Sequence, residues 1–216
     1  VNLKPGIVIW ILAGGILASW TFWPAMRQTL EAIADFKARW NYGFAMVSTA
    51  IAGGLVPGLV LLALGRSGPG WRMRLVWLVL FWAAKGAEVN LLYEMQAQVF
   101  GVRVDAGTLV LKMCFDQFVY CTIWAVPTMT IGYRLIDGGW SGLRGDFAGG
   151  SWYARRVLPV LLANWGVWIP TVLLVYALPT PLQLPVQNLV LCLWSLMVAV
   201  LAAPAEPATV SPASAR

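Results

Sequence analysis

One stretch limits what this chain can fold into. Residues 108–135 are long and apolar enough to cross a bilayer, yet Lys112, Asp116 and Gln117 stand inside them. An isolated charge buried in hydrocarbon costs at least about 2.5–3.5 kcal/mol on insertion scales, so these side chains need partners. Lys112 and Asp116 are four residues apart, on one face of an α-helix, and we expect them to neutralise each other. This helix is therefore predicted to lie inside a bundle, with Gln117 turned toward another helix.

The composition favours lipid rather than water around most of the chain. Of the 216 residues, 60% are hydrophobic and 11% are charged, whereas soluble domains average about 25% charged. A soluble protein of this size cannot hide so much apolar surface. Thirteen Trp and six Tyr agree with a membrane protein, because amphipathic rings gather at the level of the lipid headgroups. The predicted fold class is all-α, a polytopic transmembrane helix bundle whose main partner is the lipid bilayer.

The charged residues and the absence of histidine narrow the function classes. The net charge is +6, but the fifteen basic residues are scattered, so we expect the positive-inside pattern of a membrane protein and no nucleic-acid partner. A chain without histidine has no imidazole ligand for haem or zinc and no Ser/His or Cys/His pair. We expect no cofactor, no metal site and no catalytic residues, and hence no enzyme. Cys114, Cys121 and Cys192 fall in apolar segments and are expected to be small buried hydrophobes.

Six apolar runs suggest about six spans, although four or five are possible. They are residues 7–24, 44–64, 75–100, 108–135, 157–178 and 186–203. We expect the first to be a retained span rather than a cleaved signal peptide. Residues 27–42 read as an amphipathic helix in the membrane interface, or else as a solvated linker helix. Residues 136–152 read as a Gly-rich polar loop. Residues 1–203 thus form one transmembrane helical domain, followed by a Pro/Ala-rich tail at 204–216.

With six spans, the basic residues divide unequally between the two sides of the membrane. The richer side collects Lys4, Arg66, Arg72, Arg74, Arg134, Arg144, Arg155, Arg156 and Arg216, and the poorer side Arg27, Lys37, Arg39 and Arg103. Both termini are therefore expected on the cytoplasmic side of a bacterial inner membrane, or on the matrix side of an organellar inner membrane.

Glycines and prolines inside the spans predict close helix packing and bends. Gly54 and Gly58 are separated by three residues, a spacing that lets two helices approach closely, although a pore lining is an alternative. Pro57, Pro127 and Pro170 lie inside apolar runs and are expected to kink them. Carbonyls freed by these kinks could line a cavity or be accommodated by packing.

The polar residues inside the spans form the candidate site. Lys85 and Glu88 are three residues apart and can pair, and the polar half of residues 75–100 should either line an internal cavity or emerge from the membrane. We also expect Asn164 to contact Gln117 across two helices. The candidate polar seam consists of Lys85, Glu88, Lys112, Asp116, Gln117 and Asn164. It could form a solute path, or it could fix how the helices dock.

A family resemblance rests on the order of residues in the second half of the chain. It is carried by Tyr93, Lys112-Met113, Asp116-Gln117, Pro127, Asn164 with Trp168, Pro170, Pro179 and Trp194-Ser195. In these positions, over about residues 93–200, the chain resembles the peroxisomal membrane protein family of twenty-two-kilodalton type, the Mpv-like integral membrane proteins. The resemblance implies a small helical membrane protein, described for some relatives as a channel or a membrane-homeostasis factor, without a catalytic motif.

Two functions follow from these observations. The first is a non-enzymatic accessory or structural subunit of a larger membrane complex, with glycine faces and Trp-rich flanks that contact other membrane protein chains. The second is a small-solute channel or facilitator of the Mpv-like type, with the polar seam as its path.

Overall fold

The computed structural model describes residues 4–201, with the side chains of residues 7–196 among them. All regular structure in this part of the chain is helical and it contains no strand, which confirms the predicted all-α class. The predicted tail at 204–216 lies outside the described residues. In order, the elements are α1 (Lys4–Phe22), α2 (Pro24–Trp40), α3 (Tyr42–Thr49), η1 (Ala50–Leu55), α4 (Val56–Ala63), α5 (Trp71–Phe100), α6 (Ala106–Cys114), η2 (Phe115–Ala125), α7 (Val126–Ala148), η3 (Tyr153–Val157), α8 (Leu158–Tyr176) and α9 (Thr180–Leu201), where η marks a π-helical segment.

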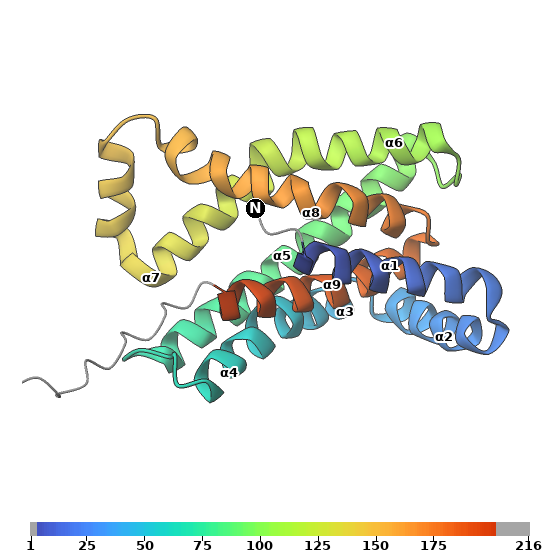
Figure 1. Cartoon of the computed structure of the whole chain (residues 1–216), viewed down its shortest axis with the longest axis horizontal. Helices are drawn as coiled ribbons and strands as arrows, with labels where there is room; N and C mark the ends of the chain where they lie inside the picture. The colour runs from blue at the N-terminus through green and yellow to red at the C-terminus, as the bar shows by residue number, and fades with distance from the viewer. Residues whose placement is uncertain (1–3, 202–216) are drawn as a thin grey trace, which may run out of the picture.

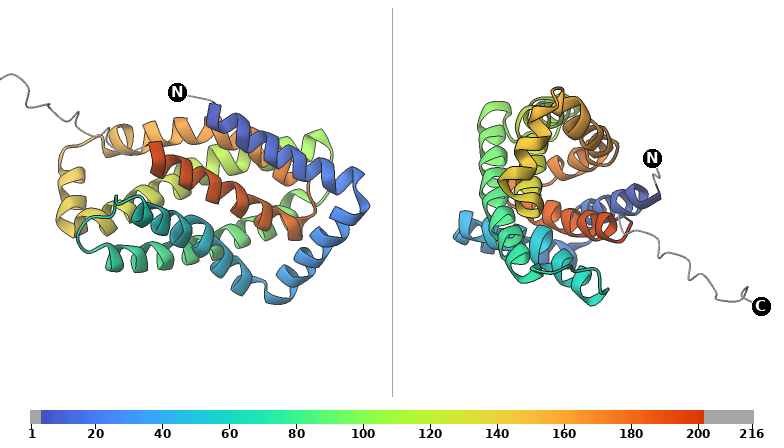
Figure 2. Two further views of the ribbon diagram at one scale, coloured as in Figure 1. Left: turned by 60° about the horizontal axis from the view of Figure 1, so that its bottom comes forward. Right: turned by 90° about the vertical axis from the view of Figure 1, so that its left-hand side faces the viewer.

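The long helix α5 connects two groups of helices. In Figure 1, α6 and α8 lie side by side above it, and α3, α4 and α9 lie below it. α1 packs against both α8 and α9, and the two views of Figure 2 keep α1 and α9 next to each other. Residues far apart in the sequence therefore meet in the space between α5, η2, α8 and α9.

The lengths and outer surfaces of the helices show that this is an integral membrane protein. Four stretches in the described part are long and apolar enough to cross a membrane, Tyr42–Ala63, Trp71–Phe100, Ala106–Ala148 and Tyr153–Tyr176, and α1 with α2 adds a fifth if the bent pair is one span. Large apolar side chains cover their outer faces; Leu80 is 54% exposed and Ile123 is 70% exposed. Lipid accommodates such a surface, and helices satisfy their own backbone polar groups there. The number of candidate spans, four or five, lies within the predicted range of four to six.

The first apolar run ends at a sharp corner that the sequence analysis did not predict. α1 stops at Phe22, α2 begins at Pro24, and the two helices are bent by 106°. Trp23 between them has an extended backbone, and Pro24 can start a helix because the first N–H groups of a helix need no intrahelical partner. The predicted helix at 27–42 is thus present as α2, while its location in the membrane interface stays a prediction.

The Gly-rich residues 136–152, expected to be a loop, are mostly helical. α7 continues through them to Ala148, interrupted at Gly139, which has a positive φ of 59°. Arg134 and Arg156 each form an ion pair of 2.7 Å with Asp146, and these pairs tie the residues beyond the kink to α7 and η3. The loop prediction was wrong because these contacts override the low helix propensity of glycine.

Gly54 and Gly58 mark a close helix contact, as predicted. A Cβ added to Gly54 would lie 3.0 Å from the carbonyl oxygen of Leu78, and one added to Gly58 would lie 2.4 Å from Cδ1 of Leu75. Both neighbours belong to α5, so the glycines allow η1 and α4 to approach that helix.

Two of the three prolines lie two residues after the end of a π-helical segment. Pro57 follows η1 and Pro127 follows η2, each at the start of the next α-helix. Proline lacks an N–H and clashes with the carbonyl four residues earlier, and the i→i+5 pattern of a π-helix accommodates such a break. Pro170 lies inside α8, which continues through it.

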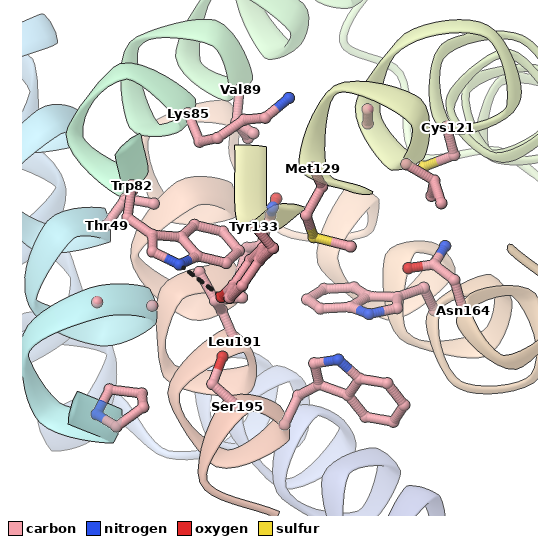
Figure 3. A pocket seen from close by; sticks show the side chains of 18 of the residues that line it. Thr49, Trp82, Lys85, Val89, Cys121, Met129, Tyr133, Asn164, Leu191 and Ser195 are labelled. Carbon is pink, nitrogen blue, oxygen red and sulfur yellow. Dashed lines mark hydrogen bonds between the residues drawn. The ribbon is translucent and has the colours of Figure 1, made fainter. Parts of the chain in front are cut away.

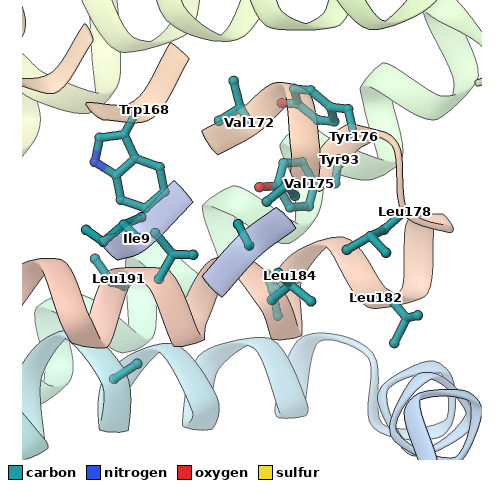
Figure 4. Close-up of a cluster of buried hydrophobic side chains, with 14 of the residues drawn as sticks. Ile9, Tyr93, Trp168, Val172, Val175, Tyr176, Leu178, Leu182, Leu184 and Leu191 are labelled. Carbon is teal, nitrogen blue, oxygen red and sulfur yellow. The ribbon is translucent and has the colours of Figure 1, made fainter. Parts of the chain in front are cut away.

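The main buried cluster joins α1, α5, α8 and α9. Figure 4 shows Ile9, Tyr93, Tyr176 and Leu184 from these four helices facing one another. Because lipid tails are as apolar as these side chains, close packing rather than removal from water stabilises the contact. The cluster holds the hydroxyl end of Tyr176 in a fixed place inside the bundle.

Candidate functional site

The six residues of the predicted polar seam come from three parts of the bundle. Lys85 and Glu88 lie on α5, Lys112, Asp116 and Gln117 lie on α6 and η2, and Asn164 lies on α8. Lys85, Lys112, Asp116 and Gln117 are all buried. The structure therefore turns the seam inward, away from lipid.

The predicted pair of Lys85 and Glu88 is present. The Lys85 ammonium donates to both carboxylate oxygens of Glu88 at 2.9 and 3.0 Å and to the hydroxyl of Thr128 at 2.6 Å. The hydroxyl of Tyr120 also donates to Glu88. The ion pair thus links α5 to η2 and α7, which explains how the polar half of α5 is accommodated inside the bundle.

The predicted pair of Lys112 and Asp116 does not form. Among the described residues no ion pair joins them, and the Lys112 ammonium lies 5.9 Å from the ring centre of Tyr176 instead. The α-helix ends at Cys114 and the π-helix η2 begins at Phe115, between the two residues. The four-residue alignment of a regular α-helix therefore does not apply to them.

Asp116 is held by neutral donors. The Tyr176 hydroxyl donates to its Oδ2 at 2.5 Å, the Gln117 amide donates to Oδ1 at 3.2 Å, and the Cys121 thiol lies 3.4 Å from the same oxygen. Gln96 in turn donates to the Tyr176 hydroxyl at 3.1 Å. Three donors can satisfy a buried carboxylate without a cation.

The predicted contact between Gln117 and Asn164 is confirmed. The Asn164 amide donates to Oε1 of Gln117 at 3.2 Å, and the indole N–H of Trp165 donates to the Gln117 backbone carbonyl at 2.9 Å. We call the connected set Gln96, Tyr176, Asp116, Gln117 and Asn164 the polar chain. It crosses the bundle from α5 through α8 and η2 and back to α8.

Sequence analysis missed two members of the polar chain, Gln96 and Tyr176. A signal for Tyr176 was present in the sequence, since Trp168, Val172 and Tyr176 follow one another at four-residue intervals in an apolar run, on one face of a helix. The structure shows that all three are buried. A tyrosine at the end of such a buried row needs a partner for its hydroxyl.

A cavity of about 610 Å³ lies against the polar chain. Four of the six seam residues line it, namely Lys85, Asp116, Gln117 and Asn164. Figure 3 shows Lys85 and Asn164 together with Trp82 and Tyr133; the indole N–H of Trp82 donates to the hydroxyl of Tyr133 at 3.1 Å. Most of the remaining wall is apolar or aromatic.

At one end the cavity reaches the part of the bundle that carries the loop between α4 and α5, because Arg66 in that loop is among its lining residues. Arg66, which is exposed, and the half-buried Arg74 line that end, whereas Asp116 is buried at the other. Gly54, Gly58 and Pro57 also line the cavity. Gly54 and Gly58 thus pack against α5 and also border the cavity, while the alternative role in a pore stays a prediction.

A second hollow of about 300 Å³ adjoins the first. It is lined by Arg134, Asp137, Asp146 and Arg156 and shares Met129, Tyr133 and Val160 with the larger cavity. Arg74 and Asp137 form an ion pair of 2.6 Å at this place.

The three cysteines of the described region are free thiols; Cys121 is buried, as expected, whereas Cys114 and Cys192 are only partly buried. In the same region no three His, Cys, Asp or Glu side chains gather as ligands of a metal ion would. Outside the spans, hydrogen bonds from the backbone N–H and the hydroxyl of Thr108 lower the pKa of Asp105, which caps the N-terminus of α6.

Comparison of the chain with protein-family models, with curated proteins and with solved structures finds no match in any of the three. The resemblance to the Mpv-like membrane proteins therefore stays a prediction.

Proposed function

We propose that this integral membrane protein is a facilitator that binds a small solute inside its helix bundle. The observation that carries the proposal is the cavity that extends from exposed Arg66 to buried Asp116. Of the two functions predicted from the sequence, the solute facilitator is the one for which such a cavity is needed.

The size and lining of the cavity support this function. Ligand pockets usually measure about 300–1,000 Å³ and combine an apolar wall with a few convergent polar groups. Here the convergent groups are Lys85, Asp116 and Asn164, and the aromatic wall includes Trp82 and Trp168. A packing device alone would fill this space with side chains, as well-packed protein interiors do.

One polar atom in the wall also lacks a partner. Oε1 of Gln187, on α9, is buried in the cavity lining and accepts no hydrogen bond. Buried acceptors normally find a donor, and a hydroxyl group of a solute could supply one here.

The accessory-subunit function is supported by a different surface. Phe22 and Trp23 are exposed at the corner between α1 and α2, and aromatic side chains are enriched at protein interfaces. In that role the corner would contact another membrane protein chain.

The described basic residues support the proposed orientation. Arg72, Arg134 and Arg156 lie at the end of the bundle formed by the start of α5 and by α7 and η3, while α2 and the start of α6 lie at the other end (Figure 1). We propose a bacterial inner membrane or an organellar inner membrane, with the richer end on the cytoplasmic or matrix side.

Solute flux into liposomes tests the facilitator. Purified protein is reconstituted, and the uptake of glycerol, lactate and inorganic phosphate is measured together with ion conductance. We expect uptake of at least one solute above empty liposomes, and a loss of most of it in Asp116→Asn, because the new amide would face donors that now point at a carboxylate.

Glu31→Gln is the matched control, since Glu31 is an exposed acid on α2 that pairs with Arg27 and does not line the cavity. Its flux should equal that of the natural sequence. Absence of flux and conductance for every solute, with a stoichiometric protein partner in a native pull-down, would reject the facilitator in favour of the accessory subunit.

A further inference from the structure

We propose that the cavity takes an amphiphile with a single anionic head, a phosphate or a carboxylate, drawn from the surrounding membrane. The head would lie among Arg74, Arg134 and Arg156, and the chain would occupy the larger cavity. This inference rests on the proposed function, because it names the class of solute that the same cavity accepts.

The first argument is that the two hollows adjoin. Met129, Tyr133 and Val160 line both of them, so the two hollows meet at these side chains, and in this proposal one molecule passes them to reach from the smaller, charged hollow into the larger one. In Figure 3, the side chain of Met129 extends into the larger cavity beside Tyr133. Met129 therefore stands where the head of an amphiphile would join its chain.

The second argument is the sign of the charge in and beside the smaller hollow, which we call the outer end of the site. Three arginines, Arg74, Arg134 and Arg156, face two carboxylates, Asp137 and Asp146, through ion pairs of 2.6–2.7 Å. The net charge of these five side chains is therefore positive, and Asp146 is shared between two guanidinium groups. A guanidinium group has five N–H donors, so each arginine keeps donors for a further anion.

Accessibility agrees with a binding role for these arginines. The side chains of Arg74, Arg134 and Arg156 are 39%, 41% and 54% exposed. An organic cation would be repelled at this place, whereas a phosphate or carboxylate can accept two parallel hydrogen bonds from one guanidinium group.

The third argument is the wall of the larger cavity. Its indole and aliphatic side chains, among them Trp82, Trp168, Trp194 and Leu191, offer little to a charged solute and suit an alkyl chain. At the deep end, Asp116 already accepts hydrogen bonds from Tyr176 and Gln117 and needs no cation from the ligand. One charge on the ligand, at the outer end, is therefore sufficient.

Quenching of the cavity tryptophans tests the inference. The protein is placed in nanodiscs of phosphatidylcholine, and ω-bromododecyl phosphate is titrated against its Trp fluorescence. The bromine at the chain end should quench saturably beside the indoles of the cavity. Equal additions of ω-bromododecanol and ω-bromododecyltrimethylammonium should bind at least about tenfold more weakly, the equivalent of one charge-assisted contact.

Three variants locate the two ends of the ligand. Arg156→Gln should weaken binding of the phosphate probe about tenfold, while Arg134 keeps its pair with Asp146. Met129→Trp should abolish quenching by closing the junction between the hollows. The matched control is Arg144→Gln, because Arg144 lies on α7, like Arg134 and Met129, and lines neither hollow. The affinity of this variant for the phosphate probe should not change.

Each other outcome has a defined meaning. Equal quenching by the three probes, or unchanged affinity in Arg156→Gln, would overturn the anionic head. Full displacement of the probe by inorganic phosphate at equal concentration would overturn the role of the chain and leave only a free-phosphate site. Flux of neutral solutes without selective quenching would reject this inference alone. Selective quenching, with no transfer across liposomes of the phosphate probe or of the three test solutes, would reject the facilitator and leave a binding site.

Discussion

At the scale of single residues, Tyr176 is the side chain on which most of the polar chain depends. Its hydroxyl donates to Asp116 and accepts from Gln96, and its ring lies beside the Lys112 ammonium. One aromatic side chain thus separates two opposite charges that the sequence alone would pair. The charges are accommodated through tyrosine rather than through each other.

Replacement of Tyr176 by phenylalanine tests this role. Tyr176→Phe should lower the free energy of unfolding by about 1–2 kcal/mol, because Asp116 loses a donor and the Gln96 amide loses its acceptor. The measurement is equilibrium unfolding in mixed micelles. Tyr153→Phe is the control, because the Tyr153 hydroxyl donates to the backbone carbonyl of Thr122 at an exposed position. An equal loss of stability in both variants would contradict the prediction.

Asp105 gives a pH-dependent prediction outside the membrane. Hydrogen bonds from the backbone N–H and the hydroxyl of Thr108 lower the pKa of Asp105 in the folded state below its unfolded value of about 3.9. The stabilising contribution is therefore complete above the unfolded pKa and is lost as the pH falls through the folded pKa. Hydrogen exchange at the Thr108 amide should accelerate relative to neighbouring helices over that acidic window, and Asp105→Asn, which caps without titrating, should lack the effect.

The candidate site was partly predictable from residue spacing. The pair of Lys85 and Glu88 follows from a three-residue interval within a regular α-helix, and the contact of Gln117 with Asn164 follows from the cost of leaving amides unpaired among apolar helices. The geometry around Asp116 could not be predicted, because the local sequence does not indicate that the helix changes to π-helical hydrogen bonding at Phe115.

At the scale of elements, the contact between α3 and α5 depends on a glycine. A Cβ added to Gly86 would lie 2.2 Å from the backbone carbonyl oxygen of Ala45, so the two helix backbones nearly touch. Backbone atoms cannot move aside as the end of a flexible side chain can. Packing of this closeness is typical of membrane helices joined by small residues.

Gly86→Ala should therefore force the two helices apart and lower the free energy of unfolding by about 1–3 kcal/mol, as overpacking does. Gly14→Ala is the matched control, because nothing lies within 4 Å of a Cβ at Gly14 in α1. That change should be neutral or slightly stabilising, since alanine favours a helix over glycine. Thermal unfolding in detergent distinguishes the two, and equal midpoints would contradict the close contact.

Element types were easier to predict than their ends. Long apolar runs without charges gave the helices at residues 44–64 and 157–178 nearly as the structure has them. The corner at Trp23 and the helical Gly-rich residues depend on tertiary contacts, such as the two ion pairs of Asp146. Such contacts between distant residues are not visible in local composition.

At the scale of the whole molecule, α5 fixes the relation between the two ends of the bundle. It is one continuous helix of 30 residues, about 45 Å at 1.5 Å per residue, and so longer than the hydrocarbon core of about 30 Å. The residues before and after it should therefore lie on opposite sides of the membrane.

Thiol labelling tests this arrangement. In a background where Cys114, Cys121 and Cys192 are serine, single cysteines are introduced as Gly68→Cys and Val102→Cys, one before and one after α5. A reagent that cannot cross membranes should label one of them in intact cells and the other only after permeabilisation. With the basic end on the cytoplasmic or matrix side, Val102→Cys is the externally labelled one; labelling of both from one side would contradict the span.

The π-helical segment η2 has a consequence for how this chain can vary in length. Its eleven residues close i→i+5 rings, so the segment holds more residues per turn than the α-helices beside it. A single-residue deletion there can be absorbed by a return to α-helical winding, whereas the same deletion in α8 would rotate every later side chain by about 100°. The helix that carries Asp116 should thus tolerate the loss of one residue with less harm to the remaining contacts than the regular α-helix α8.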